Sequence, residues 1–440
     1  MNRLLIAGTG SGCGKTTTTL ALLSALKAEG HHPTAFKCGP DYIDPMFHRA
    51  VSGVSAYNLD PFFLDGLGLR THLSRNSGPL NILEGAMGYY DGIAATDEAS
   101  AYTVARETET PAVLVVSAKG AGHSLAAVLE GFAHHRADSG IRGVIFNDAG
   151  VMRYPDLQTI AAQAGIRAYG YLPRVPEWSV PGRHLGLMTA EEIFGLREKI
   201  GAMGEQAARS LDISGLLDLA ATAPKLPLAP PLPRIGRTVR LAVARDAAFC
   251  FLYQDNLDLL ESLGCELVFF SPLADAALPE NIHGLYLCGG YPELHAETLE
   301  ANASMRNSVR CAIQRGLPTI AECGGFLFLH DTLDGRAMCG AVRGAAFETA
   351  RLQRFGYITL TAKKDNLLCA KGQFIRSHEF HYWDSESPGA DFIAAKAGRD
   401  RTYPCVHATE TLYAGFPHLY LPANVRFAEN FVSAMERSKQ

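Results

Sequence analysis

The chain has 440 residues, of which 47% are hydrophobic and 19% are charged, and its formal net charge at pH 7 is −5. This balance is typical of a folded globular protein rather than a disordered one, and it lacks the basic surplus expected of a nucleic-acid-binding protein. No apolar run approaches the roughly 20 residues of a membrane span. We therefore expect a cytoplasmic protein of two domains whose partners include neither nucleic acid nor a membrane.

The first half of the chain alternates short apolar runs with amphipathic stretches. A helix is predicted over residues 15–29, closed by Gly30. Buried parallel strands are predicted at four apolar runs, residues 4–7, 80–83, 112–118 and 144–146. This alternation of strands and helices is typical of an α/β domain built on a parallel sheet.

The segment APKLPLAPPLPRIGR, residues 223–237, is the richest in proline and has neither helical nor strand periodicity. We interpret it as a linker, so that the predicted domains span residues 1–222 and 238–440. After it the alternation begins again, with the apolar runs VRLAVARD, CELVFF, GLYLCGG and LPTIAECGG. The sequence therefore predicts two doubly wound α/β domains, with functional residues at the carboxyl ends of strands.

The sequence GTGSGCGKTT, residues 8–17, lies between the first predicted strand and the first helix, which is the context of a phosphate-binding loop (P-loop). Its glycines let backbone amides approach an anion, and the helix N-terminus adds a positive dipole. We predict that the lysine contacts the β- and γ-phosphates and that Thr16 offers its hydroxyl to magnesium. The alternative is a tight turn without a ligand. The candidate nucleotide-binding residues are Gly10, Gly12, Gly14, Lys15, Thr16 and Thr17.

Two acidic stretches lie at the ends of predicted strands. KCGPDYIDP, which begins at residue 37, follows a further predicted strand, the second along the chain, and ILEGAMGYYDG, which begins at residue 82, places Glu84 at the end of the apolar strand. Hard oxygen ligands at strand ends suit the magnesium ion of a nucleoside triphosphate, so Asp41 and Glu84 are candidate metal ligands. Asp44 and Asp91 leave three roles open, because they could hold a second metal, orient a substrate or cap turns.

The segment PTIAECGGFLFL, residues 318–329, reads as an apolar strand, a cysteine, two glycines and an apolar helix. Cys323 would then sit on a sharp strand-to-helix turn, which exposes a nucleophile and points helix amides at it. The glycines permit the crowded turn. The alternative is that Cys323 is a buried cysteine at the end of a strand.

The amino-terminal motifs resemble two known groups of enzymes. The loop, with Thr9 where the usual pattern has its first glycine, resembles that of dethiobiotin synthetase and related carboxylate-activating synthetases. Partition ATPases differ, because they carry a lysine at the position of Gly10. The two acidic stretches, together with PGRHLGL at residues 181–187, resemble the cobyrinic acid a,c-diamide synthase family. This resemblance implies that Asn147, which ends the run GVIFN, contacts adenine.

The second half resembles the class I glutamine amidotransferases. Cys323 matches their nucleophile, and YLCGGYPE at residues 286–293 matches their oxyanion strand. The resemblance implies that a thiolate attacks glutamine and that Gly289 and Gly290 stabilise the tetrahedral intermediate.

The histidine of that family corresponds to His418 in AGFPHLYLP, with His378 and His381 as competitors for the role of base. Class I enzymes usually carry a glutamate two residues after this histidine, whereas this chain has Tyr420. The missing third member casts doubt on a strong glutaminase activity of the second domain, although the cobyrinic acid synthase family also lacks it.

The two sets of motifs together imply an ATP- and Mg²⁺-dependent ligase. Its expected reaction is amidation of the a and c acetates of cobyrinic acid in cobalamin biosynthesis, through acyl phosphates, with glutamine or ammonia as nitrogen donor. A homodimer is compatible with this interpretation. The hydrogenobyrinic acid enzyme, nickel-sirohydrochlorin a,c-diamide synthase and cobyric acid synthase remain rivals, although cobyric acid synthase differs in the segment that corresponds to GPDYIDP. A non-enzymatic ATP-dependent scaffold or switch is the alternative from another class.

Overall fold

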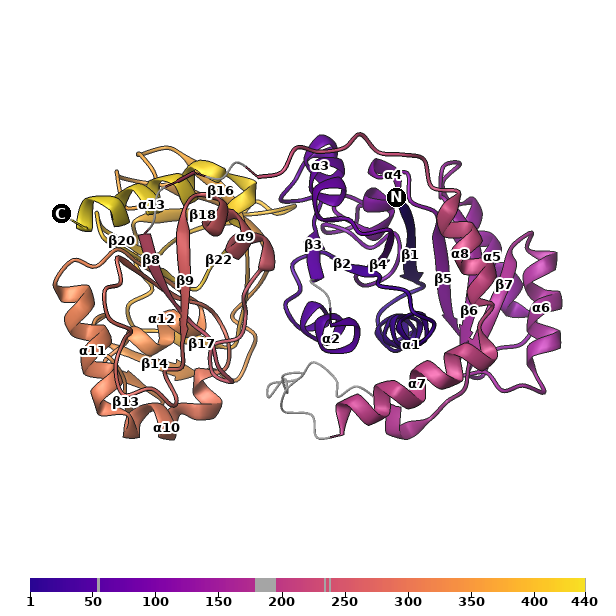
Figure 1. Cartoon of the computed structure of the whole chain (residues 1–440), viewed down its shortest axis with the longest axis horizontal. Helices are drawn as coiled ribbons and strands as arrows, with labels where there is room; N and C mark the ends of the chain where they lie inside the picture. The colour runs from indigo at the N-terminus through magenta and orange to yellow at the C-terminus, as the bar shows by residue number, and fades with distance from the viewer. Residues whose placement is uncertain (54–55, 179–194, 233–234, 237–238, 440) are drawn as a thin grey trace. The chain divides into compact units, whose positions relative to one another are not determined.

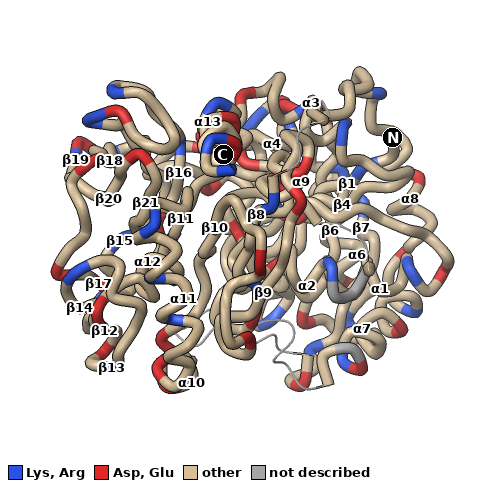
Figure 2. The backbone as a smooth tube through the Cα atoms, turned by 60° about the vertical axis from the view of Figure 1, so that its left-hand side comes forward, with Lys and Arg blue, Asp and Glu red and all other residues tan. Residues whose placement is uncertain are grey.

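The computed structural model describes residues 1–53, 56–178, 195–232, 235–236 and 239–439 (Figure 1). These residues form two compact units, Met1–Pro231 and Leu232–Gln440. The motif PGRHLGL at residues 181–187 lies outside the described residues. Lys and Arg are interspersed with Asp and Glu along the chain (Figure 2). None of the described helices is long and apolar enough to cross a membrane.

The first unit is built on a seven-stranded sheet with the order β3-β2-β4-β1-β5-β6-β7. All of its strand pairs are parallel. Its strands are β1 (Asn2–Gly8), β2 (Thr34–Cys38), β3 (Ala56–Leu59), β4 (Leu80–Glu84), β5 (Ala112–Ser117), β6 (Ile141–Asn147) and β7 (Arg167–Leu172). The predicted strands are thus present, and the carboxyl ends of β1, β2 and β4 meet at one edge.

Helices cover both faces of this sheet, which explains why its strands read as continuous apolar runs. Leu4 and Ile6 of β1 belong to one core, and Leu5 and Ala7 belong to the other. The first core includes residues of α1 (Lys15–Ala28), α2 (Ile43–Ser52), α7 (Leu196–Ser210) and α8 (Ile213–Ala221). The second includes residues of α3 (Gly66–Asn76), α4 (Ala101–Glu107), α5 (Ser124–His134) and α6 (Tyr154–Gln163).

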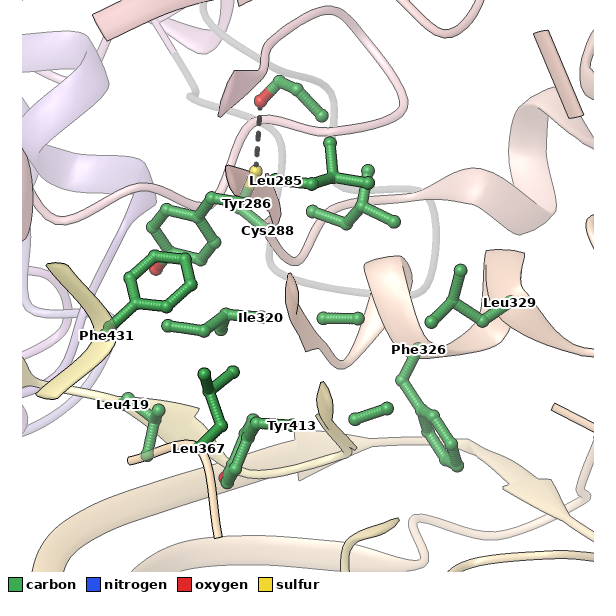
Figure 3. Packing of buried hydrophobic residues seen from close by; sticks show 14 of the residues in the cluster. Leu285, Tyr286, Cys288, Ile320, Phe326, Leu329, Leu367, Tyr413, Leu419 and Phe431 are labelled. Carbon is green, nitrogen blue, oxygen red and sulfur yellow. Dashed lines mark hydrogen bonds between the residues drawn. The ribbon is translucent and has the colours of Figure 1, made fainter. Parts of the chain in front are cut away.

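The second unit contains a six-stranded sheet with the order β20-β21-β11-β10-β8-β9. Its pairs are parallel except β20 with β21 at the edge. Its strands are β8 (Val239–Ala244), β9 (Cys265–Phe270), β10 (Gly284–Leu287), β11 (Thr319–Glu322), β20 (His407–Ala408) and β21 (Leu412–Gly415). Its helices are α9 (Gln254–Ser262), α10 (Ala296–Ala301), α11 (Ala303–Gln314), α12 (Gly324–Leu329) and α13 (Val425–Ser438). Side chains of β10, β11, β21, α12 and α13 pack together in its core (Figure 3).

Two further sheets of this unit were not anticipated. One has the order β19-β18-β15-β16-β22 and is antiparallel throughout. Its strands are β15 (Arg354–Ala362), β16 (Phe374–His381), β18 (Phe392–Lys396), β19 (Thr402–Cys405) and β22 (His418–Leu419). The other joins β12 (Thr332–Leu333), β13 (Arg336–Ala337), β14 (Ala345–Glu348) and β17 (Trp383–Ser385). In β15, buried residues alternate with more exposed ones. The sequence of this strand therefore contains no continuous apolar run from which the strand could be predicted.

The proline-rich stretch is fastened to the first unit over residues 224–230. The buried guanidinium of Arg3 donates to the carbonyl of Pro224 at 2.7 Å. Ser74 Oγ donates to the carbonyl of Pro227 at 2.7 Å, and Arg75 Nε donates to that of Pro230 at 3.0 Å. Each bond uses a carbonyl that proline retains, since proline itself cannot donate through its nitrogen. We call residues 224–230 the strap.

Candidate active sites

The loop between β1 and α1 depends on glycine at its last position. Gly14 has φ of 102°, which is a left-handed conformation, and it directly precedes α1. A Cβ atom on Gly14 would lie 2.2 Å from Asn147 Nδ2, which itself donates to the carbonyl of Cys13 at 3.2 Å. Lys15 Nζ bends back over the loop and donates to the carbonyl of Gly10 at 2.8 Å. The structure therefore brings Asn147 against the P-loop, as the prediction of a shared nucleotide site requires.

Glu84 is the centre of a buried polar network behind this loop. Its Oε1 accepts hydrogen bonds from Thr16 Oγ1 and Lys37 Nζ, both at 2.8 Å. Its Oε2 lies 2.7 Å from His48 Nε2. Lys37 Nζ also lies 2.5 Å from Asp44 Oδ2, so one ammonium group is shared by two buried carboxylates. The network joins the first turn of α1 to the ends of β2 and β4 and to α2.

The charge of Glu84 is maintained by its neighbours. Burial alone would raise the pKa of this carboxyl group, but the positive charge of Lys37 and the hydrogen bond from His48 hold the pKa well below its usual range. The carboxylate is therefore ionised at neutral pH. A buried charge of this kind is tolerated only when a partner compensates it, and Lys37 is that partner.

The other predicted acidic residues lie in turns. Asp41 Oδ1 accepts hydrogen bonds from the backbone amides of Ile43 at 2.9 Å and Asp44 at 3.2 Å, so it caps α2. Asp91 is exposed, and its Oδ2 accepts from the amide of Gly88 at 2.7 Å. The structure thus unites Asp44 with Glu84, while Asp41 and Asp91 have turn-capping contacts. The assignment of Asp41 as a metal ligand stays a prediction.

Lys37 and His48 were not among the predicted site residues. Two signals could have found them. Lys37 is a lysine within a buried apolar strand, where an unpaired charge would be costly. His48 follows Asp44 by four residues on α2, so the two side chains share one helical face.

The site residues fit a magnesium ion that is bound together with a nucleotide. Within the described ranges, no cluster of three or more His, Cys, Asp or Glu side chains could hold a metal ion by itself. Thr16 and Glu84 already lie within hydrogen-bonding distance of each other. One hydroxyl and one carboxylate match the way Mg²⁺ is bound in nucleotide sites, because phosphate oxygens and water complete its octahedral shell.

Cys323 lies on a sharp turn between β11 and α12, as predicted. Its φ of 45° is unusual for a residue with a side chain. Its amide donates to the carbonyl of Gly415 at 2.8 Å, which ties the turn to β21. A Cβ atom on Gly325 would lie 2.2 Å from the carbonyl oxygen of Leu287, so the helix can approach β10 only with glycine there. The crowded turn holds the thiol in one place.

The predicted oxyanion segment and histidine meet this turn. A Cβ atom on Gly324 would lie 2.9 Å from the backbone nitrogen of Gly290. A Cβ atom on Gly289 would lie 2.5 Å from Cε1 of His418. The three segments singled out in the second half of the sequence therefore converge on one buried place. This convergence is the geometry that a cysteine-dependent amidotransferase requires.

His418 is enclosed by other polar side chains. Its Nδ1 lies 4.0 Å from Glu322 Oε2, and its ring stacks on that of His378 with centroids 4.9 Å apart and 16° between planes. Burial lowers the pKa of His418 to about 3. The third candidate base, His381, makes a 2.6 Å hydrogen bond through Nδ1 to the carbonyl of Trp383. His418 is the candidate base whose ring lies against Gly289 of the oxyanion segment.

Comparison with known proteins decides the family. Residues 4–187 match the CobQ/CobB/MinD/ParA nucleotide binding domain, and residues 240–424 match the CobB/CobQ-like glutamine amidotransferase domain. The cobyrinate a,c-diamide synthase of Priestia megaterium is 38% identical over 456 residues, which cover 100% of this chain and 98% of that protein. The chain belongs to the cobyrinate a,c-diamide synthase family.

Other members of the cobyrinate a,c-diamide synthase family show the same extent of similarity. The protein of that name from Listeria monocytogenes serotype 4b (strain F2365) is 36% identical over 453 residues, covering 99% of this chain and all of that protein. The one from Thermoplasma volcanium is 36% identical over 442 residues, covering 98% and 96%. The predicted family and the predicted pair of α/β domains are confirmed, and the chain is a glutamine-dependent ligase rather than a scaffold.

This member of the cobyrinate a,c-diamide synthase family has no glutamate two residues after His418. Tyr420 occupies that position; it is fully buried, and its ring lies edge-on to that of Tyr253 with centroids 5.2 Å apart. A buried tyrosine in an aromatic contact cannot act as the missing carboxylate. A carboxyl group does approach the histidine from β11, where Glu322 Oε2 lies 4.0 Å from His418 Nδ1.

Proposed function

We propose that the chain amidates the a and c acetate carboxylates of cobyrinic acid, with ATP as the activating substrate and glutamine as the nitrogen donor. The observation that carries this proposal is the similarity to cobyrinate a,c-diamide synthases over the whole chain. The two converging sets of site residues support it, because one suits a nucleoside triphosphate and the other suits release of ammonia from glutamine.

The reaction needs both sites because ammonia cannot displace an oxygen from a free carboxylate. In the first step, a carboxylate oxygen of the macrocycle attacks the γ-phosphorus of ATP, and the bond between that phosphorus and ADP breaks. The product is an acyl phosphate. Ammonia then attacks the acyl carbon, the carbon–oxygen bond breaks, phosphate leaves and nitrogen loses a proton. The amide and phosphate are the products.

In the first unit, the backbone amides of the P-loop and Lys15 would hold the phosphates. Thr16 and Glu84 would hold magnesium, which when bound neutralises charge on the transferred phosphoryl group. Asp44 forms an ion pair with Lys37, which also pairs with Glu84. We therefore place Asp44 beside the transferred phosphoryl group or a second cation. We assign Asp91, on its exposed turn, to the macrocycle side of the site.

In the second unit, the Cys323 thiolate attacks the side-chain carbonyl carbon of glutamine. The backbone amides of Gly289 and Gly290 stabilise the resulting oxyanion. His418 takes the thiol proton and returns it to the departing nitrogen, so that ammonia leaves and a thioester remains. Water then hydrolyses the thioester to glutamate and regenerates the thiol.

The decisive test replaces Cys323 and compares two nitrogen donors. Cys323→Ala should abolish synthesis from glutamine but leave synthesis from ammonium salt within about twofold of wild type, because activation lies in the other unit. Cys311→Ala removes an exposed cysteine of the same unit and serves as the matched control. Equal loss of synthesis with both donors would show that Cys323 has a structural role.

A second test identifies the macrocycle. Cobyrinic acid, hydrogenobyrinic acid and nickel-sirohydrochlorin would be supplied in parallel with ATP, magnesium and glutamine, and each amidation would be followed by mass. We expect two successive amidations of cobyrinic acid at the highest kcat/KM. Higher kcat/KM for either rival would reassign the substrate while leaving the ligase chemistry in place.

A further inference from the structure

Glu322 is a buried carboxylate to which the reaction above gives no role. It ends β11 directly before Cys323 and is 1% exposed. Its Oε2 lies 4.0 Å from Nδ1 of His418 and accepts a 3.2 Å hydrogen bond from the hydroxyl of Tyr286. Its Oε1 accepts a 3.0 Å hydrogen bond from the amide of Leu419. Tyr286 and Leu419 belong to the packed core (Figure 3). Their hydrogen bonds therefore fix the carboxyl group of Glu322 from two sides.

We propose that Glu322 is the positioning residue of His418 and replaces the carboxylate that is missing at Tyr420. The inference rests on the proposed function, in which Cys323 is the nucleophile and His418 its base. The amide that holds Glu322 belongs to Leu419, the residue after the histidine, so β22 carries both the imidazole and the anchor of its carboxylate. Glu322 thus reaches His418 from β11, the strand that precedes the nucleophile, and not from β22, the strand that carries the histidine.

Glu322 and His418 are both buried, and burial penalises an isolated charge on either side chain. Burial raises the pKa of Glu322 to about 8 and lowers the pKa of His418 to about 3, so each charge alone is disfavoured. When the thiol of Cys323 gives its proton to His418, the new imidazolium lies beside a group that can carry the opposite charge. A carboxylate at this distance therefore stabilises the imidazolium–thiolate state over the neutral state.

Two other histidines of the described residues bear on His418. His378 stacks on it, and the hydroxyl of Tyr253 lies 3.3 Å from Nδ1 of His378. His381 acts in the opposite sense, because its positive charge would lower the pKa of His418 further.

Three acidic side chains affect the pKa of the Cys323 thiol. After burial, which has the largest effect, Glu293, Glu322 and Glu379 all raise its pKa. Glu322 therefore has two opposing effects, one on the thiol and one on the imidazole. We infer that the effect on His418 dominates, because that contact lies within ion-pair distance.

The test replaces the carboxyl group of Glu322 by an amide of similar shape that cannot become negatively charged. Glu322→Gln retains an oxygen that can accept from Leu419, and the full chain would be alkylated with iodoacetamide across a pH series. Modification of Cys323 would be followed by peptide mass. We expect the pH midpoint of alkylation to rise by about one unit. The kcat of glutaminase should fall by about 10- to 100-fold, while synthesis from ammonium salt stays within about twofold.

The conservative variant Glu322→Asp distinguishes charge from packing. It should keep the midpoint within about 0.3 units of wild type and give an intermediate glutaminase rate. An unchanged midpoint in Glu322→Gln, or equal shifts in both variants, would overturn the role of Glu322. Failure of the proposed function has a different signature, namely that Cys323→Ala retains glutaminase activity.

Discussion

Lys37 allows a quantitative test of the buried network, because it is the cation shared by two carboxylates. Lys37, Asp44 and Glu84 are all buried, with at most 4% of any of the three side chains exposed. Lys37→Met keeps a side chain of similar length but leaves Asp44 and Glu84 without their shared cation. Breaking a buried ion pair by removing one partner costs about 3 to 5 kcal/mol. We expect the free energy of unfolding of the first unit to fall by that amount at pH 7.5.

The loss should depend on pH in a defined direction. In the wild type, the lowered pKa of Glu84 means that its stabilising contribution is present above its unfolded pKa, and is lost only as the pH falls through the folded pKa. Without Lys37, the largest of the effects that lower the pKa of Glu84 is lost, so its folded pKa rises. The difference in stability from wild type should then grow with pH, by at most about 1.4 kcal/mol per pH unit, between the folded pKa of the wild type and that of the variant.

The two tryptophans permit the measurement in the intact chain. Trp178 is half-buried against a core of the first unit, whereas Trp383 belongs to the second. In a Trp383→Phe background, urea unfolding followed by the fluorescence of Trp178 would report the first unit at pH 5.5 and 7.5. Lys225→Met, which removes an exposed lysine, is the control. A loss below about 1 kcal/mol, or an equal loss at both pH values, would refute the argument that Lys37 compensates buried charge.

Three other outcomes follow from the same sites. Gly14→Ala should weaken ATP binding at least about tenfold in calorimetry, because its Cβ atom would meet Asn147; Gly131→Ala, at a helical glycine with open space, should not. Glu84→Gln should reduce synthesis about 100-fold or more with either nitrogen donor while sparing glutaminase, and near-normal synthesis at limiting magnesium would exclude Glu84 as a ligand. One P-loop activates one carboxylate at a time, so a mass-spectrometric time course should show monoamide rise and fall; diamide without any monoamide in solution would contradict release between rounds.

The residues that could be predicted are those whose signal is local. The P-loop and Cys323 each follow a short apolar strand and Glu84 ends one, and the end of such a strand can be recognised from a few consecutive residues. Parallel topology then brings strand ends to one edge, which is why Glu84 and the P-loop meet.

The residues that could not be predicted depend on contacts between distant segments. Lys37 acquires its role only because α2 packs so that Asp44 reaches it. Glu322 contacts His418 through a strand that arrives 97 residues later, at Leu419. The five-stranded antiparallel sheet carries both His378 and His418, and its half-buried strands lack the apolar runs that mark the parallel sheets. Pairing across such a sheet has no signature in either strand alone.

The strap has a practical consequence for dissecting the molecule. Composition alone would mark residues 223–237 as the place where a protease cuts and where a fragment of the first unit should end. The hydrogen bonds of Arg3, Ser74 and Arg75 to this stretch indicate otherwise. A fragment ending at residue 222 would deprive the buried guanidinium of Arg3 of one acceptor, at a cost of about 1 to 3 kcal/mol. A fragment that extends to Pro231 keeps that acceptor, and protease cleavage within residues 224–230 requires the strap to detach first.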